Sequence, residues 1–379
     1  MRKVIIIYKT IPQYRRRFFE MVRERLAQQD VEFVLLYGQP SRLDALKKDT
    51  VDFPWAIKIP SRIWEIGNLE IYWQPVLGYL KNADLVIVEQ ASKLLVNYVL
   101  LIRNALGIQK LAFWGHGKNF HATPSNWFAE WIKRLISTHV HWWFAYNDLS
   151  AQTVRELGFP QERITHVQNA IDTRQLTDAL VALSKQKVEQ VRRELGIHSA
   201  NVAIYTSGIY PEKRIPFLLE SLYLIRKQVP DFEMIFIGSG VDAGLIEQAV
   251  SQNSWIHYLG PKFDNEKVPY FAISKLFLMP GLVGLGILDS FALETPLITT
   301  RIPLHSPEID YLKNNINGIM LDDADNVQAY ADMVAQLLLD EPRRQRLVKE
   351  CQISREQYTV EAMVANFSQG VLQAIKNVR

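Results

Sequence analysis

Short apolar runs alternate with longer amphipathic stretches along most of the chain. In the first half, β-branched and aromatic runs that indicate buried strands lie at 4–8, 31–37, 84–89, 110–115 and 141–146. The same alternation restarts in the second half, with runs at 201–208, 232–240, 255–260, 275–281, 296–300 and 317–321. Strands that alternate with helices are typical of parallel sheets with crossover helices, so the pattern predicts an α/β fold built from two such units.

A charged helical stretch separates the two units. It runs from Ser184 to Leu195 and ends at Gly196, which suits the C-cap of a helix. We therefore expect the hinge near residues 170–200, with domains at 1–195 and 196–358. A last segment, 359–379, is predicted to be a helix that needs a surface to cover, because one stripe carries Met363, Val364, Phe367, Val371, Leu372 and Ile375.

Composition narrows the class of protein. A chain of 379 residues with 48% hydrophobic and 22% charged residues is long enough for two globular domains, and no apolar run reaches the ~18 residues of a membrane span. The short apolar run at the start does not resemble a signal peptide, so a cytoplasmic location is expected. Cys351 is the only cysteine, and no Cys/His cluster suggests a metal or another cofactor. A net charge of +3 is too small to indicate nucleic-acid binding.

Two segments mix cations with aromatic side chains. They are Tyr14–Phe19, which contains three consecutive arginines, and 127–134, which contains two tryptophans, Lys133 and Arg134. Such segments can lie on an anionic membrane face. The alternative is that the aromatics belong to the core and the cations form a solvated helix face. The sequence leaves both interpretations open.

The stretch 278–296 carries the strongest chemical signal. An apolar strand is followed by glycines at 281, 284 and 286 and by a helix that contains Asp289. Glycines ahead of a helix let backbone N–H groups approach a phosphate, and a carboxylate one turn later can accept a sugar hydroxyl. This combination indicates a nucleotide, although a strand, a glycine turn and a helix also recur in α/β proteins without any ligand.

Two other loops follow strands in the second unit. They are Ser207–Arg214 and Gly238–Gly240, and ligands of open parallel sheets bind beyond the carboxyl ends of the strands. Lys213 and Arg214 come just before a predicted helix, where a cation can neutralise a diphosphate. Taken singly, Lys213 fits a solvated lysine better; taken with the glycine loops, it is the best candidate to bind a phosphate. Gly238 and Gly240 lack the third glycine of a dinucleotide fingerprint.

Candidate chemistry in the first unit is sparser. His116 lies between glycines after the strand at 110–115, where it could handle a proton or, alternatively, cap a backbone carbonyl. Glu89 and Gln90 end the preceding strand and either face substrate or begin a helix. The acidic cluster at 322–325 fits a polar turn better than a cation site, because a calcium loop is longer.

These motifs together resemble the retaining glycosyltransferases of the GT-B fold, in the large family usually numbered four. The resemblance covers nearly the whole chain, and its motifs lie at 206–222, 234–240, 257–260 and 280–300, with weaker matches at 145–173 and 307–321. It implies two facing Rossmann-like domains, the first for the acceptor and the second for a nucleotide sugar. It also implies that the final helix returns to the first domain.

The resemblance assigns roles to particular residues, with two departures. The family places two glutamates eight positions apart, one near the donor sugar and one on the ribose; this chain has Gly281 and Asp289 there. Lys213 matches a phosphate-binding lysine, and Arg214 is a substitute for the arginine that is absent. The other residues that the resemblance places around the donor are Tyr14, Arg15, Gly208, Gly240, Leu282, Val283, Gly284, Leu285 and Gly286. It also places Pro261, Lys262 and Phe263 beside the base of the nucleotide. His116 matches a family histidine and, with Lys213, is assigned a catalytic role; Glu89 and Lys118 are placed on the acceptor side.

By resemblance, the reaction is metal-independent sugar transfer with retention, needing no cofactor. Family frequency favours UDP-glucose as donor, and a saccharide or lipid-linked saccharide as acceptor, in envelope or exopolysaccharide synthesis with peripheral membrane contact. Two alternatives stay open: a binding protein for nucleotide sugars that does not catalyse, and an epimerase of the same fold. A nicotinamide oxidoreductase is disfavoured, because no glycine fingerprint follows the first strand.

Overall fold

The computed structural model describes residues 1–45, 50–66, 69–117 and 136–376. They form two compact units, Met1–Asn169 with Val360–Arg379 and Ala170–Thr359. The boundary lies earlier than the 195/196 division expected from sequence, within the predicted hinge region. The physical reason is packing: α6 (Thr173–Val181) and α7 (Lys185–Leu195) contact α10 (Val268–Ala272), so they are built into the second unit.

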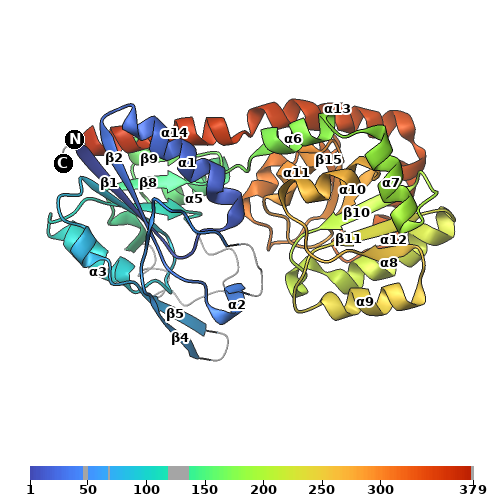
Figure 1. Cartoon of the computed structure of the whole chain (residues 1–379), viewed down its shortest axis with the longest axis horizontal. Coiled ribbons are helices and arrows are strands. Elements are labelled where there is room, and N and C mark those ends of the chain that lie inside the picture. Colours follow the sequence, from blue (N-terminus) through green and yellow to red (C-terminus); the bar gives the residue numbers. More distant parts are fainter. Residues whose placement is uncertain (46–49, 67–68, 118–135, 377–379) are drawn as a thin grey trace. The chain divides into compact units, whose positions relative to one another are not determined.

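The first unit contains a seven-stranded parallel sheet in the order β3-β2-β1-β6-β7-β8-β9 (Figure 1). Its strands are β1 (Arg2–Tyr8), β2 (Val31–Tyr37), β3 (Ile57–Lys58), β6 (Leu85–Glu89), β7 (Leu111–Gly115), β8 (Trp142–Ala145) and β9 (Ile164–His166). An antiparallel pair, β4 (Arg62–Ile66) and β5 (Leu69–Trp73), forms a separate hairpin. The helices of this unit are α1 (Arg16–Ala27), α2 (Arg42–Ala45), α3 (Val96–Ala105), α5 (Asp148–Glu156) and α14 (Val360–Lys376).

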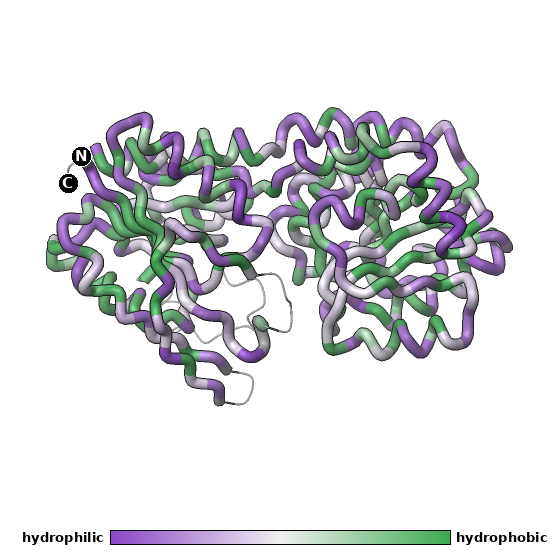
Figure 2. Tube along the Cα trace, viewed as in Figure 1, coloured by the Kyte–Doolittle hydropathy of each residue, from purple (hydrophilic) through white to green (hydrophobic). Residues whose placement is uncertain are grey.

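The second unit contains a six-stranded parallel sheet in the order β12-β11-β10-β13-β14-β15. Its strands are β10 (Val202–Thr206), β11 (Glu233–Ile237), β12 (Ile256–Tyr258), β13 (Leu276–Leu278), β14 (Leu297–Thr300) and β15 (Gly318–Leu321). The remaining helices are α8 (Ile215–Gln228), α9 (Ala243–Gln252), α11 (Gly286–Ala292), α12 (Val327–Leu339) and α13 (Glu341–Gln357). Figure 2 shows the apolar character of the central strands, which are buried as parallel strands covered by helices must be.

Both sheets have the strand order of a Rossmann fold, in which the direction of strand addition reverses once. The reversal lies between β1 and β6 in the first unit and between β10 and β13 in the second. The α/β class, the parallel sheets and all eleven strands predicted from sequence are confirmed, as is Gly196 as the left-handed C-cap of α7. Ligands of such folds bind beyond the carboxyl ends of the strands at this reversal.

The final helix α14 returns to the first unit, as predicted, and packs against α1 (Figure 1). Phe367 contacts the rings of Phe18, Trp114 and Phe144, with centroids 4.6–5.3 Å apart. Gly370 lies so close to Thr165 that a Cβ there would be 2.2 Å from its Oγ1. The helix therefore completes the aromatic core of the first unit.

Candidate donor site in the second unit

The strand reversal of the second unit brings two loops together. Residues 207–214 follow β10 and residues 279–286 follow β13, and these two strands are neighbours. The loops touch directly, since the Leu282 N–H donates to the Glu212 carbonyl at 2.8 Å. Three further bonds fix the same loop: Lys213 Nζ to Leu282 O, the Val283 N–H to His305, and the Ser306 N–H to Val283 O. Every polar backbone group of Leu282 and Val283 is thus satisfied.

The next residues of the loop differ in kind. Gly284, Leu285 and Gly286 are partly exposed, whereas residues 281–283 are buried. Within the part of the chain that the structure describes, no hydrogen bond uses the amide of Gly284 or Leu285 as donor. The loop therefore holds two adjacent N–H groups on a pinned backbone at the surface, an arrangement suited to an anion.

Lys213 is the cation of this site, and it is buried with 3% of its surface exposed. Its Nζ donates to the Leu282 carbonyl at 2.5 Å and lies 5.3 Å from the centre of the Tyr210 ring. Burial lowers the pKa of Lys213 to about 7, opposed by the nearby Glu212 carboxylate. A solvated lysine is therefore ruled out for this position, and the amine can change its charge near neutral pH.

His305 is part of the site and was missed in the sequence. Its Nδ1 accepts from the Val283 N–H at 3.1 Å, and its Nε2 donates to the Thr300 carbonyl at 2.7 Å. These two partners require the neutral tautomer with the proton on Nε2. Burial lowers the pKa of His305, and the nearby Lys213 lowers it further. His305 is therefore a neutral brace behind the glycine-rich loop.

Replacing His305 with alanine should leave the Val283 N–H buried without an acceptor, at a cost of about 1–3 kcal/mol in the free energy of unfolding. Urea unfolding checks this, with the exposed His198→Ala as control, which should change by less than about 0.5 kcal/mol. Because the folded pKa of His305 is depressed, its contribution is present above the ordinary histidine pKa of about 6.5 and is lost as pH falls. Equal acid sensitivity of wild type and His305→Ala would contradict this role.

Asp289 lies in α11 and is buried. Its Oδ1 accepts from Lys267 Nζ at 2.7 Å, an ion pair in which both side chains are about nine-tenths covered. Lys267 was not among the predicted site residues. The pair orients the Asp289 carboxylate, so that its second oxygen can accept from a ligand hydroxyl.

Arg214 does not join Lys213. Its backbone is left-handed, with φ of 57°, which turns the side chain toward the loop after β15. There the guanidinium donates to Thr300 Oγ1, to the Ala324 carbonyl and to Asp325 Oδ1, at 3.2, 2.7 and 2.6 Å. This side chain braces the 324–325 turn, and nothing in its contacts supports the substitution for a phosphate-binding arginine.

Three glycines of the predicted site are explained by close packing. A Cβ on Gly281 would lie 2.4 Å from the Glu212 carbonyl oxygen and 2.5 Å from that of Lys213. A Cβ on Gly238 or Gly240 would lie 1.9 or 2.0 Å from the carbonyl oxygens of Ser207 and Ile209. Backbone meets backbone at each position, so these residues let the three loops stack. Gly208 differs, because its nearest neighbour would be the movable Tyr210 ring.

The loop predicted to flank a base follows β12, at the margin of the sheet. Pro261 is exposed, Lys262 lies over the Tyr270 ring, and the Phe263 N–H donates to Glu266. These residues share the carboxyl side of the sheet with the glycine-rich loop. Their role toward a base stays a prediction.

The predicted residues of the first unit gather at its own strand reversal. Glu89 Oε2 accepts from the Lys9 N–H at 2.6 Å, and burial raises the pKa of Glu89. Gln90 braces the next loop by accepting from the Gly117 N–H at 2.9 Å, and the His116 ring lies tilted against the Tyr146 ring, with centroids 4.3 Å apart. Lys118 lies outside the described residues, as do 127–134.

For the segment Tyr14–Phe19, the structure supports the interpretation that the aromatic side chains belong to the core. Phe18 and Phe19 are fully buried, and Arg15 is buried too, with its guanidinium bound to Asn169 Oδ1 at 2.5 Å and near the Trp114 and Tyr146 rings. The membrane interpretation of this segment is therefore wrong. Tyr14 is exposed beside Arg15, and both stay predicted donor neighbours.

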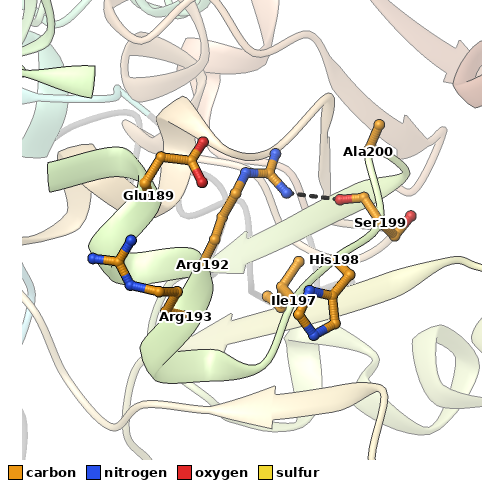
Figure 3. A pocket seen from close by; sticks show the side chains of 7 residues that line it. All are labelled: Glu189, Arg192, Arg193, Ile197, His198, Ser199 and Ala200. Atoms are coloured by element: carbon orange, nitrogen blue, oxygen red, sulfur yellow. Dashed lines mark hydrogen bonds between the residues drawn. The ribbon is translucent and has the colours of Figure 1, made fainter. Parts of the chain in front are cut away.

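A pocket in the second unit lies elsewhere (Figure 3). It is lined by Glu189, Arg192 and Arg193 of α7 and by residues 197–200. Residues 199 and 200 directly precede β10, so the pocket is at the amino end of that strand, opposite the glycine-rich loop. Arg192 already donates to the Ser199 carbonyl at 2.7 Å. We therefore do not assign the donor to this pocket.

Comparison with known proteins relates the second unit to a family of enzymes. Residues 200–340, which contain the whole glycine-rich site, match the model of the group 1 glycosyl transferases. This part of the chain is similar to the group 1 glycosyl transferases. Spore coat protein SA of Bacillus subtilis is 24% identical over 177 residues, a match that covers 42% of this chain and 45% of that protein. The matched part thus spans less than half of that relative.

Solved structures of glycosyltransferases share the fold of this chain over nearly its full length. HepE of Anabaena, solved in complex with UDP-glucose, has a TM-score of 0.70 at 14% identity and covers 98% of this chain and 100% of its own. A glycosyltransferase of Rickettsia africae has a TM-score of 0.71 at 14% identity, covering 100% and 99%. The pneumococcal O-GlcNAc transferase GtfA, in complex with UDP and GlcNAc, has a TM-score of 0.69 at 12% identity, covering 99% of each chain.

Proposed function

We propose that this glycosyltransferase moves a sugar from a UDP-sugar to a saccharide or lipid-linked saccharide, with retention of the anomeric configuration. The observation that carries the proposal is the pinned loop, where two unused amides of Gly284 and Leu285 adjoin the buried amine of Lys213. The uridine nucleotides in the HepE and GtfA structures support a uridine donor. Glucose is the favoured sugar, and the inner face of a membrane is the favoured location.

In this proposal the diphosphate is held where charge develops. The bond from the sugar C1 to the β-phosphate oxygen breaks, and the acceptor oxygen forms its bond to C1 on the same face. The acceptor proton passes to the departing phosphate. Amides fixed before the reaction and a nearby ammonium stabilise the negative charge without having to reorganise, which is the largest effect available to such a site.

Asp289 is proposed to accept the ribose hydroxyls. In support, Lys267 holds the carboxylate by one oxygen and leaves the other for the ligand. Asp289→Asn should raise the KM for the donor about tenfold or more, because a hydrogen bond to a charged group contributes about 1.5–3 kcal/mol. Steady-state kinetics measure this, with Asp322→Asn as control, since Asp322 is exposed and pairs with Arg301. An unchanged KM for the donor would exclude Asp289 from the ribose.

The proposed function is tested by incubating the purified chain with UDP-, GDP- and ADP-sugars. A thermal-shift screen should single out UDP-sugars, because a ligand at about a hundred times its Kd stabilises by about 2.7 kcal/mol. Release of UDP on addition of a saccharide or polyprenyl-diphosphate saccharide then shows transfer. A shift with none of the three nucleotide classes would overturn the proposal.

One observation favours a second candidate, a nucleotide-sugar-binding protein that does not catalyse. Gly281 occupies the position of the family's sugar-binding glutamate, and the backbone of Glu212 and Lys213 leaves no room for any side chain there. Binding of UDP-glucose with neither transfer nor hydrolysis would support this candidate. Transfer of the sugar would exclude it.

A further inference from the structure

The outward face of α3 carries an apolar stripe that no part of the described chain covers. Its members recur at helical spacing, with exposed fractions of 36% for Leu95, 39% for Tyr98, 62% for Ile102 and 69% for Leu106. The opposite face of the helix is buried through Val96, Asn97, Leu100 and Asn104. Ile108, 56% exposed, continues the stripe beyond the last turn. We call these five residues, Leu95, Tyr98, Ile102, Leu106 and Ile108, the α3 face.

Exposed apolar side chains are concentrated around the α3 face. Of the 18 large apolar residues exposed in the described chain, nine fall between Ile57 and Ile108. The turn after Leu77 and Tyr79 is joined to the end of α3, because Gln109 donates to the Ala83 carbonyl at 2.8 Å. At the other end, the Leu95 N–H donates to the Tyr72 carbonyl of β5 at 2.9 Å. These two bonds fix the neighbouring turn and β5 against the two ends of the helix.

The charge around the α3 face is mainly positive, with the Glu70 carboxylate of β5 paired to Lys93 at 3.5 Å. The sequence contains no aspartate or glutamate from Gln90 to Ala129, whereas Lys93, Arg103 and Lys110 fall within or beside α3. Lys81 is exposed on the adjoining turn. The nearby Asp84 is occupied, since its carboxylate accepts from the Lys3 N–H at 2.7 Å. Such a surface complements an anionic partner.

We propose that the α3 face docks on an anionic membrane surface, with the helix lying in the plane of the headgroups. Apolar side chains on one side of a helix bury in the headgroup region, and flanking cations are drawn to anionic lipids. Among the described residues, no helix combines the length and the apolar character of a membrane span. A second copy of the chain fits less well: a ten-residue helix offers on the order of 200 Å², against roughly 800 Å² per partner in a stable dimer.

The proposal also places the membrane beside the predicted acceptor side of the first unit. The chain leaves β6 at Glu89 and Gln90 and enters α3 only a few residues later. Docking by the α3 face would hold a lipid-linked acceptor near this strand end. The docking itself does not depend on the donor, and it is measured without any nucleotide.

Vesicle flotation tests the proposal, with phosphatidylglycerol–phosphatidylcholine vesicles compared with pure phosphatidylcholine. Wild type should float with the anionic vesicles, and Ile102→Ser with Leu106→Ser should weaken binding about tenfold or more, because two buried apolar side chains are lost. The matched control is Val181→Ser with Leu339→Ser, two residues of the second unit exposed by 82% and 65%. The control should bind like wild type, and all variants should keep the wild-type melting temperature.

A second set of variants, which neutralise cations beside the α3 face, tests the electrostatic part of the binding. Lys81→Gln and Arg103→Gln should each weaken binding to the anionic vesicles about fivefold, since a cation near such a surface contributes about 1 kcal/mol. Equal binding to neutral and anionic vesicles, or no loss in the Ile102/Leu106 variant, would overturn the proposal. So would sedimentation of wild type as a dimer that the same variant dissociates, because the face would then bind a second copy. None of these outcomes bears on donor chemistry.

Discussion

Replacing Lys213 with methionine is expected to lower the kcat for sugar transfer about 100-fold or more. The amine is the buried cation beside the Gly284 and Leu285 amides, and loss of one preformed contact to a charge that develops in the transition state costs about this much. Methionine has a similar length and no charge, so it fills the same buried space. Initial rates under saturating donor measure the effect, with unfolding by urea to show that the variant is folded.

The Lys213→Met variant also tests how donor affinity depends on pH. Because burial lowers the pKa of Lys213 to about 7, the wild type loses this charge as pH rises through neutrality. Its affinity for UDP-glucose should fall by up to about tenfold per pH unit above 7, and that of Lys213→Met should not. UDP-glucose is the right probe, since a terminal phosphate has its own pKa of about 6. Parallel pH profiles for both proteins would remove Lys213 from the diphosphate site.

Linkage gives a matching effect on the unliganded protein. Folded Lys213 binds fewer protons than the unfolded chain between pH 7 and its ordinary pKa of 10.5. The free energy of unfolding should therefore rise with pH across this interval and fall as pH drops through 7. The methionine variant should lack this component.

Gly281→Ala is expected to destabilise the second unit by about 2–3 kcal/mol. The added methyl would lie 2.4 Å from backbone atoms of Glu212 and Lys213, so two loops must separate. Their separation breaks the bond from the Leu282 N–H to Glu212 and displaces the amides that follow. Donor affinity should fall along with stability. Calorimetry and donor titration measure the two quantities.

Gly244→Ala is the matched control for this substitution. A Cβ at Gly244 meets nothing within 4 Å, and the residue lies in α9, where alanine favours the helix by about 1 kcal/mol. The control should be neutral or slightly stabilising. If Gly281→Ala were equally well tolerated, the close approach of the two loops would not be a feature of the protein in solution. Gly281→Glu, which introduces the glutamate that the resemblance predicts at this position, should destabilise the protein for the same steric reason.

Much of the fold could be predicted because parallel strands are buried on both faces. Runs such as Val4–Tyr8 and Leu85–Val88 are continuous and apolar, and no surface position interrupts them. The strands that were missed are short or lie outside this pattern. Ile57 and Lys58 of β3 are both exposed, and the β4–β5 hairpin stands apart from the main sheets. Neither β3 nor the β4–β5 hairpin has the continuous apolar run from which the other strands were predicted.

The site could be predicted only where its parts are neighbours in sequence. Lys213 and the glycines at 281–286 were found from spacing alone. His305 and Lys267 were not, because each bonds a residue 22 positions away on another element. Arg214 shows the converse: adjacency to Lys213 suggested a shared role, but a left-handed backbone at Arg214 directs the two side chains apart. The type of a residue does not determine a local backbone conformation of this kind, so the sequence could not predict it.

The return of α14 to the first unit has a consequence for biosynthesis. Residues 170–359 leave the ribosome as one continuous segment, so the second unit can form its core as soon as they are made. The first unit cannot complete its core until residues 360–376 have been made. Until then Phe18, Trp114 and Phe144 lack the ring of Phe367, and Arg15 lacks its contact with Met363. The first unit is therefore synthesised first but completes its fold last. A chain that stops before Val360 would expose the aromatic core of the first unit to chaperones and proteases.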